Sequence, residues 1–340
     1  MRLGLSGLAL GAALLGGLIY SLGPAGVARD VMQAGWALPG ATAIHMGQLA
    51  LSALAWGAAL DGVPFLIVYR VRWIREAVNS LLPVAQIGGP VVGARLLAQA
   101  GVPPARAGAA TTLDLMTEAA GQIVFTLAAV AIVASISSDK SWTGWTGGGL
   151  VAAVAGLAAL VGVQRAGGLR LVEAVAERLL RRWPGLPLAG LRGLHADLMQ
   201  LQARPLVIAR GVAWHTLSWA MGAAEVWVIL RAIGQPVSPG ACFVIESFGM
   251  MARSAAFMVP GAVGVQEGGF VLAAGLFGVP AEAAVALSVI KRMRELIVGG
   301  AGIAAWLRLK RRHGKSGPAT PLQVAMAAQL EPLVATDRKE

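Results

Sequence analysis

Pairs of charged residues stand at helical spacing inside hydrophobic stretches of this sequence. Asp114 and Glu118 are four residues apart and share a helix face, and Lys291 and Glu295 repeat that spacing, which allows them to pair. The other charges in such stretches include Arg95, Glu246, Arg253, Glu267, Arg292 and Arg294. A charge at the centre of a bilayer costs about 2.5–3.5 kcal/mol, so these residues indicate a functional site. We interpret them as a polar path for a charged headgroup.

Mutual neutralisation is the alternative interpretation of these charges. Asp114 or Glu118 is then expected to pair with Arg292 or Arg294, which alone would justify the residues. The two interpretations overlap, because a polar path also consists of buried charges. His45, near the start of a hydrophobic run, is interpreted as incidental.

The composition predicts an all-α, polytopic integral membrane protein. Of 340 residues, 56% are hydrophobic and 13% are charged, against about 25% charged in soluble domains. The net charge of +11 lies between hydrophobic runs, which favours anionic lipid over nucleic acid as the partner. The single cysteine, Cys242, excludes a disulfide framework and a thiolate metal site within one chain.

Hydrophobic runs divide the chain into roughly eight transmembrane helices, some of them broken. The first run is long enough to be a retained helix rather than a signal peptide. The runs fall near 3–23, 40–60, 80–100, 108–136, 147–164, 206–233, 240–257, 260–279 and 281–306. They predict one transmembrane domain over 1–306, followed by a tail over 307–340 that is basic and then disordered.

Basic loops predict the orientation in a bacterial inner membrane. Arg70, Arg72 and Arg75 follow the second run, and a basic loop covers 165–205. Basic loops stay cytoplasmic, so both termini are predicted to be cytoplasmic. Within the long loop, residues 169–183 place apolar side chains on one helix face and arginines mostly off that face. This pattern predicts an amphipathic helix lying at the membrane interface.

The stretch 78–107 has to return to the side it entered from if those loops are cytoplasmic. It is therefore predicted to be re-entrant or broken into two short pieces, the alternative being a kinked ordinary helix. Its helix-breaking residues are Pro83, Gly88, Gly89 and Pro90. Irregular backbone at this depth survives only where protein or a watery cavity satisfies it.

An internal repeat relates this stretch to a later one. A shift of 177 residues places Pro83 on Pro260 and Glu118 on Glu295 without a gap. The second copy has its own breakers, Pro260, Gly261 and Gly264. Repeats with paired, interrupted segments point to a binding site at the repeat interface in transporters. Chance similarity between two apolar segments is the alternative.

Motifs for nucleotide, dinucleotide or metal chemistry are not found in the sequence. It has no GxxxxGK[ST], HExxH or GxSxG, and its four histidines are scattered. We therefore expect no cofactor, no metal and no catalytic residue.

The motifs NSLLPVAQIGGPVVGARLLAQAGV, VPGAVGVQEGGFVLAAGLFGV and ALSVIKRMREL resemble the lysylphosphatidylglycerol synthase transmembrane (flippase-like) family. The resemblance covers roughly residues 40–306 and is greatest to the hopanoid-associated, HpnL-type branch. It implies broken membrane helices and movement of lipid between leaflets. It does not imply aminoacyl transfer, since no synthase segment is recognisable. Carried over by position, the motif residues are Asn79, Pro83, Gly88, Gly89, Arg95, Asp114, Glu118, Pro260, Gly261, Gly264, Glu267, Lys291, Arg292 and Glu295.

These observations predict a lipid translocator for a hopanoid or a polar or amino-lipid. Glu267 is expected to face a cavity opened by the helix breaks, where Arg292 and Arg294 attract an anionic headgroup. One alternative is a scaffold that recruits lipid-biosynthesis enzymes through residues 169–183. Another is a membrane enzyme acting on a lipid headgroup.

Overall fold

The computed structural model describes residues 16–82, 88–136, 193–256 and 262–313, and single positions between 151 and 162. Every regular element in these ranges is helical, which confirms the all-α prediction. The predicted amphipathic helix at 169–183, most of the basic loop at 165–205, and the breakers Pro83, Pro260 and Gly261 lie outside the described residues.

Prolines and glycines mark several helix ends. Pro205 and Pro239 begin two helices, and the Ser238 hydroxyl caps the second by accepting from the Ala241 N–H at 3.2 Å. The helices of the first half are α2 (Pro24–Ala34), the short η1 (Gly35–Ala37), α3 (Leu38–Gly57), α4 (Phe65–Leu81), α5 (Gly88–Gln99) and α6 (Pro104–Ile136). Those of the second half are α9 (Leu194–Gln202), α10 (Pro205–Ile233), α11 (Pro239–Ala255), α12 (Val265–Gly275) and α13 (Ala281–His313).

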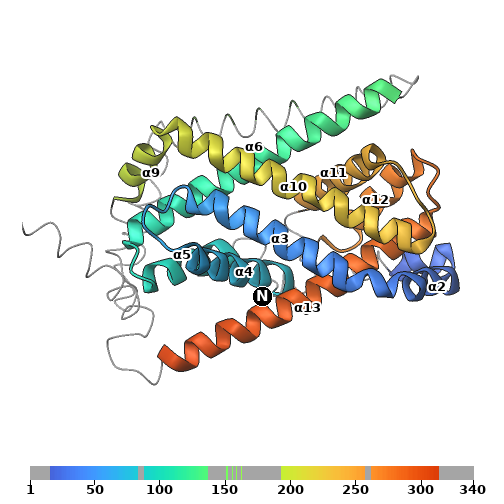
Figure 1. The fold of residues 1–340 in the computed structure, drawn as a ribbon, viewed down its shortest axis with the longest axis horizontal. Coiled ribbons are helices and arrows are strands. Elements are labelled where there is room, and N and C mark those ends of the chain that lie inside the picture. Colours follow the sequence, from blue (N-terminus) through green and yellow to red (C-terminus); the bar gives the residue numbers. More distant parts are fainter. Residues whose placement is uncertain are drawn as a thin grey trace, which may run out of the picture.

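The helix boundaries reproduce the internal repeat. Helices α5 and α12 begin 177 residues apart, and α6 and α13, both of 33 residues, are separated by the same offset at both ends. Helices α3 and α10 end within one residue of that offset. Figure 1 shows α6 and α13 running in opposite directions on opposite sides of the molecule, so the second copy is inverted relative to the first.

Each copy contains a helical hairpin with a short second arm. In the first, Gly89 lies against Asn79 and Gly93 against Arg75, so α4 and α5 run antiparallel. In the second, Gly269 lies against Ala252 of α11, and the next residue of α12 lies against the preceding turn. The short arms have 12 and 11 residues, about 17 Å of helix, which is roughly half the hydrocarbon thickness. That length agrees with a re-entrant arrangement, which stays a prediction.

The two copies are interlocked. Helix α13 of the second copy packs on α4 of the first, and α6 of the first packs on α11 of the second. Helices α3 and α10, which are equivalent in the two copies, pack along each other at the centre (Figure 1). Each hairpin is therefore held by the long helix of the other copy.

The structure corrects the reading of Arg70, Arg72 and Arg75 as a cytoplasmic loop. All three lie in α4, and Arg72 and Arg75 are only 4% and 2% exposed. Because Arg72 and Arg75 are bound to carboxylates inside the protein, these two arginines give no topology signal; Arg70 is exposed on the same helix. The parity argument for the stretch 78–107 loses that premise, and the orientation of the termini stays a prediction.

The residues Gly88, Gly89 and Pro90 do not interrupt a helix. They form the first turn of α5, where proline is tolerated because its missing N–H would have no intrahelical partner. Gly264 is the residue before α12, with φ at +84°. A side chain would be strained there, so glycine suits this helix start.

Two described helices, α6 and α10, are long and apolar enough to cross a membrane on length and composition alone. Helix α4 is shorter, and α13 carries several charges along its length. The buried charges of these two helices are Arg72 and Arg75 of α4 and Lys291 and Arg294 of α13, and each of them is paired with a carboxylate.

Candidate functional site

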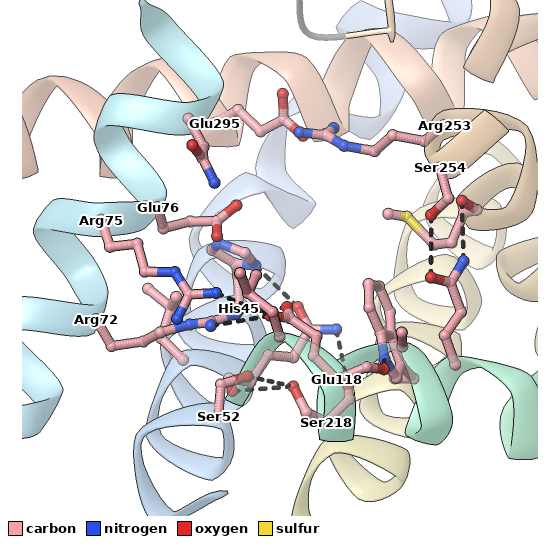
Figure 2. A pocket seen from close by; sticks show the side chains of 18 of the residues that line it. His45, Ser52, Arg72, Arg75, Glu76, Glu118, Ser218, Arg253, Ser254 and Glu295 are labelled. Carbon is pink, nitrogen blue, oxygen red and sulfur yellow. Dashed lines mark hydrogen bonds and ion pairs between the residues drawn. The ribbon is translucent and has the colours of Figure 1, made fainter. Parts of the chain in front are cut away.

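A cavity of about 370 Å³ lies between the two copies of the repeat. It is lined by three pairs of equivalent helices, namely α3 and α10, α4 and α11, and α6 and α13. Figure 2 shows side chains from these helices around an open centre. The charged residues that line it are Arg72, Arg75, Glu76, Glu118, Glu246, Arg253, Arg294 and Glu295.

A first cluster of charges joins α4 to α6. The Arg72 guanidinium donates to both Glu118 carboxylate oxygens, at 2.7 and 3.1 Å, and to Asp114 at 3.2 Å. Arg75 donates to the same two carboxylates, and Nε2 of His215 lies 3.0 Å from Asp114 Oδ1. Two guanidinium groups thus neutralise two carboxylates, and the Asp114 side chain is wholly buried.

A second cluster ties α13 to α10 and α11. The Lys291 ammonium lies 2.8 Å from Glu246 and 3.2 Å from Glu225. Arg294 donates to Glu225 through Nε at 3.0 Å. These four side chains are at least 95% buried and carry balanced charge.

A third cluster surrounds the start of α12. Arg253 donates to Glu295 at 2.6 Å, and Arg292 bridges Glu295 and Glu267. Glu267 also accepts from the Gly264 backbone N–H at 2.6 Å, which caps α12, and from Ser288 at 2.9 Å. Glu267 is therefore both a helix cap and the partner of a cation.

Neutral polar groups complete the cavity wall. Nδ1 of His45 lies 2.8 Å from Gln48 Oε1, while the Gln48 amide donates to the Ser218 carbonyl at 3.2 Å. On the opposite side, Ser254 donates to Gln122 at 3.0 Å. The cavity therefore offers donors, acceptors and both signs of charge to one ligand. His45, interpreted as incidental from sequence, belongs to this wall.

The structure brings most of the predicted site residues together. Six line the cavity, and these are Asn79, Glu118, Glu246, Arg253, Arg294 and Glu295. Asp114, Glu267, Lys291 and Arg292 lie behind them, bound to cavity residues or to the first helix turn of α12. Asn79 also accepts from the Gly89 N–H at 2.9 Å and so joins the two arms of the first hairpin.

Two of the expected positions are different. Glu267 does not line the cavity, because its carboxylate is turned into the start of α12. Arg95 is exposed on the outer face of α5, away from the charge clusters.

The expected ion pairs are also rearranged. Asp114 and Glu118 pair with Arg72 and Arg75 rather than with Arg292 or Arg294. Glu295 pairs with Arg253 and Arg292 instead of Lys291 four residues away. Arg292 lies three residues from Glu295 on the same helix, whereas Arg253 and the partners of Asp114 come from other helices, so sequence spacing alone does not select the partner.

Sequence reasoning missed the contribution of α4. Arg72, Arg75 and Glu76, which were not predicted as site residues, face the cavity from this helix beside the predicted Asn79. Counted from Arg72, these residues follow at three, four and seven positions, which places them on one helix face. The pattern was missed because the arginines were interpreted as part of a loop.

Among the described residues, Asp114, Glu118 and His215 bring three metal-type donor atoms within 4.8 Å of one another. Both carboxylates are already bound by arginines in this arrangement. Two adjacent guanidinium charges oppose a metal cation there, so the group is better suited to ion pairing.

A second hollow is apolar and lies on the other face of the α6–α10 contact. It is bordered by Val124 of α6 and by small and branched residues of α10 from 209 to 220. These are the two helices that are apolar enough to span a membrane, so this face suits hydrocarbon.

A family model described as the lysylphosphatidylglycerol synthase TM region matches residues 4–302. No curated protein and no solved structure matches the chain at a comparable level.

Proposed function

The chain belongs to the lysylphosphatidylglycerol synthase transmembrane-region family, and we propose that it is a bacterial inner-membrane lipid translocator whose headgroup path is the charged cavity. The role that we assign to the cavity is binding and passage, without a chemical step. Its partners in this proposal are membrane lipids with a polar headgroup.

The observation that carries this proposal is the position of the cavity. It lies at the interface of two inverted copies and is lined by the same three helices of each. Inverted repeats that enclose a polar site between them are the architecture of many secondary transporters, in which one repeat rocks against the other. A wholly structural charge network would need no open volume at its centre.

The charge balance of the cavity suits transient binding of a headgroup. The guanidinium groups of Arg253 and Arg294 offer forked donors to a phosphate or another anion. Glu295 already binds Arg253 and Glu225 already binds Arg294, so an anion is exchanged for a carboxylate rather than trapped. The hydrocarbon part of the lipid remains in the bilayer.

The substrate assignment is a further part of the proposal. The resemblance to the hopanoid-associated branch suggests a hopanoid, and a cavity with both signs of charge suits a polar or amino-lipid headgroup.

Lipid sidedness in proteoliposomes tests the proposal. The purified chain is reconstituted with fluorescent phospholipid, aminolipid or hopanoid-type probes, and loss of inner-leaflet protection is followed over time. We expect faster loss with wild type than with empty vesicles. Arg253→Gln should slow it about tenfold, because a hydrogen bond to a charged group contributes about 1.5–3 kcal/mol.

Arg231→Gln is the matched control. Arg231 lies in the last turn of α10 and over the Trp227 ring on the surface, outside the cavity. The Arg231→Gln variant should move lipid at the wild-type rate. Equal rates in wild-type and empty vesicles for every probe, with or without a pH gradient, would contradict the proposal and favour the scaffold alternative.

A further inference from the structure

One carboxylate at the cavity differs from the others in having no cationic partner within ion-pair distance among the described residues. Seven acidic side chains line it or lie directly behind it, and six of them are within ion-pair distance of an arginine or lysine. These six are Asp114, Glu118, Glu225, Glu246, Glu267 and Glu295. The seventh is Glu76, whose carboxylate has no hydrogen-bond or ion-pair partner within the described part of the chain.

Glu76 is placed to meet a ligand. It is partly buried on α4, lines the cavity and projects from that helix toward the open centre in Figure 2. Its neighbours Arg72 and Arg75 are engaged by Asp114 and Glu118. Glu76 therefore adds a negative charge that the nearest cations do not neutralise by contact.

Comparison of the two copies of the repeat also distinguishes Glu76 from the other carboxylates. Glu118 and Glu295 are 177 residues apart, at equivalent positions, and both line the cavity. The equivalent of Glu76 by the same offset is Arg253, which donates to Glu295 at 2.6 Å. The first copy thus has a carboxylate where the second has a guanidinium, so the two halves of the cavity differ in sign at this position.

The carboxylates around the cavity outnumber the lysine and arginine cations by one. Against seven carboxylates stand six cations, which are Arg72, Arg75, Arg253, Lys291, Arg292 and Arg294. This count leaves out the two nearby histidines: His45 Nδ1 lies 2.8 Å from Gln48 Oε1, and His215 Nε2 lies 3.0 Å from Asp114 Oδ1. The ionisable groups that line the cavity from the other helices are His45 of α3, Glu118 of α6, Glu246 and Arg253 of α11, and Arg294 and Glu295 of α13.

We propose that Glu76 binds the one positive charge that enters the cavity, either as the ammonium of a lipid headgroup or as a proton. This inference deepens the proposed function and rests on it for the site. The partly buried Glu76 carboxylate faces the cavity without a contacting cation, so a cation that arrives with the ligand would form a charge-assisted hydrogen bond there. A headgroup with a phosphate and an amine would place the amine at Glu76 and the phosphate toward Arg253.

Binding of two phospholipids to the purified chain tests the inference. Native mass spectrometry at pH 7 compares phosphatidylethanolamine, which carries an ammonium, with phosphatidylglycerol, which does not. If the charge is on the headgroup, wild type should prefer phosphatidylethanolamine and Glu76→Gln should reduce that preference about tenfold. Glu282→Gln, the same change in the first turn of α13 outside the cavity, should keep it.

The proton arm uses phosphatidylglycerol alone at pH 8 and pH 6. If Glu76 binds a proton, wild type should bind this lipid more tightly at pH 6, and Glu76→Gln should bind equally at both values. The inference is overturned if Glu76→Gln equals wild type and Glu282→Gln in both headgroup preference and pH dependence. If wild type moves no lipid in proteoliposomes but the binding differences are observed, the proposed function is contradicted and the assignment of Glu76 as a cation-binding residue stands.

Discussion

At the scale of single residues, the buried charges are linked in neutral clusters. Asp114 is bound by Arg72, Arg75 and His215, so each member of the cluster depends on several others. Removal of one partner leaves an uncompensated buried charge, which typically costs about 3–5 kcal/mol. The clusters are therefore expected to hold the two copies together as well as to shape the cavity.

Asp114→Asn tests this role. The amide keeps the shape of the side chain but leaves Arg72 and Arg75 with one anion between them, so the thermal midpoint in detergent should fall clearly. Asp61→Asn is the matched control, because Asp61 pairs with Arg204 in an exposed loop where solvent screens the interaction. Equal thermal midpoints for the two variants would show that the buried cluster contributes no special stability.

The partners of these charges were beyond sequence reasoning. The spacing of Asp114 and Glu118 predicted that they share a face and are buried, but their cations are about forty residues away on a helix read as a loop. Ion-pair partners depend on how helices cross, and that geometry is not written in local spacing. Glu118 and Glu295, which are matched by the repeat, do line the same cavity.

At the scale of helices, close contact in the hairpins depends on glycine. The α11–α12 hairpin brings the Phe270 ring against Gly249 with no room for a Cβ atom. Aromatic rings bury a large apolar area, so this contact fixes the separation of the two arms. The hairpin packs against α6 and α13, and its position sets one wall of the cavity.

Gly249→Ala is expected to destabilise the protein by about 1–3 kcal/mol, because the added methyl group has to displace the Phe270 ring. Gly268→Ala is the control within the same hairpin. Gly268 has open space at its Cβ position, and alanine in a helix is favoured by up to about 1 kcal/mol, so this variant should be neutral or slightly more stable. Thermal unfolding in detergent measures both. A Gly249→Ala variant as stable as Gly268→Ala would contradict the close packing.

The short helices show what the pattern of prolines and glycines predicted and what it did not. The pattern correctly predicted that the chain breaks in both copies, and the offset of 177 held for α5 and α12. In the first copy the break lies between the end of α4 at Leu81 and the start of α5 at Gly88, so Gly88, Gly89 and Pro90 form the first helix turn after the break. Breakers identify an interruption more reliably than its boundary.

At the scale of the whole molecule, the inverted repeat explains why one cavity draws on the entire chain. The long helix of each copy packs on the hairpin of the other, so α6 and α13 both reach the cavity from opposite directions (Figure 1). Rocking of one copy against the other would move α4 relative to α11 across the open centre. Such rocking would change the side of the protein from which the cavity is reached, while the same residues continue to line it.

The most direct test of the cavity as the lipid path is to block it reversibly. Ser254→Cys places a thiol on the cavity wall, while the natural Cys242 is buried and leaves wild type as the unlabelled control. Lipid sidedness in proteoliposomes is followed before labelling with a bulky methanethiosulfonate, after labelling, and after reduction. Ser21→Cys, an exposed position on the N-terminal side of the chain and outside the cavity, is the labelled control. We predict that labelling stops lipid movement in Ser254→Cys, that reduction restores it, and that Ser21→Cys is unaffected. Lipid movement at the unlabelled rate in fully labelled Ser254→Cys would contradict the account.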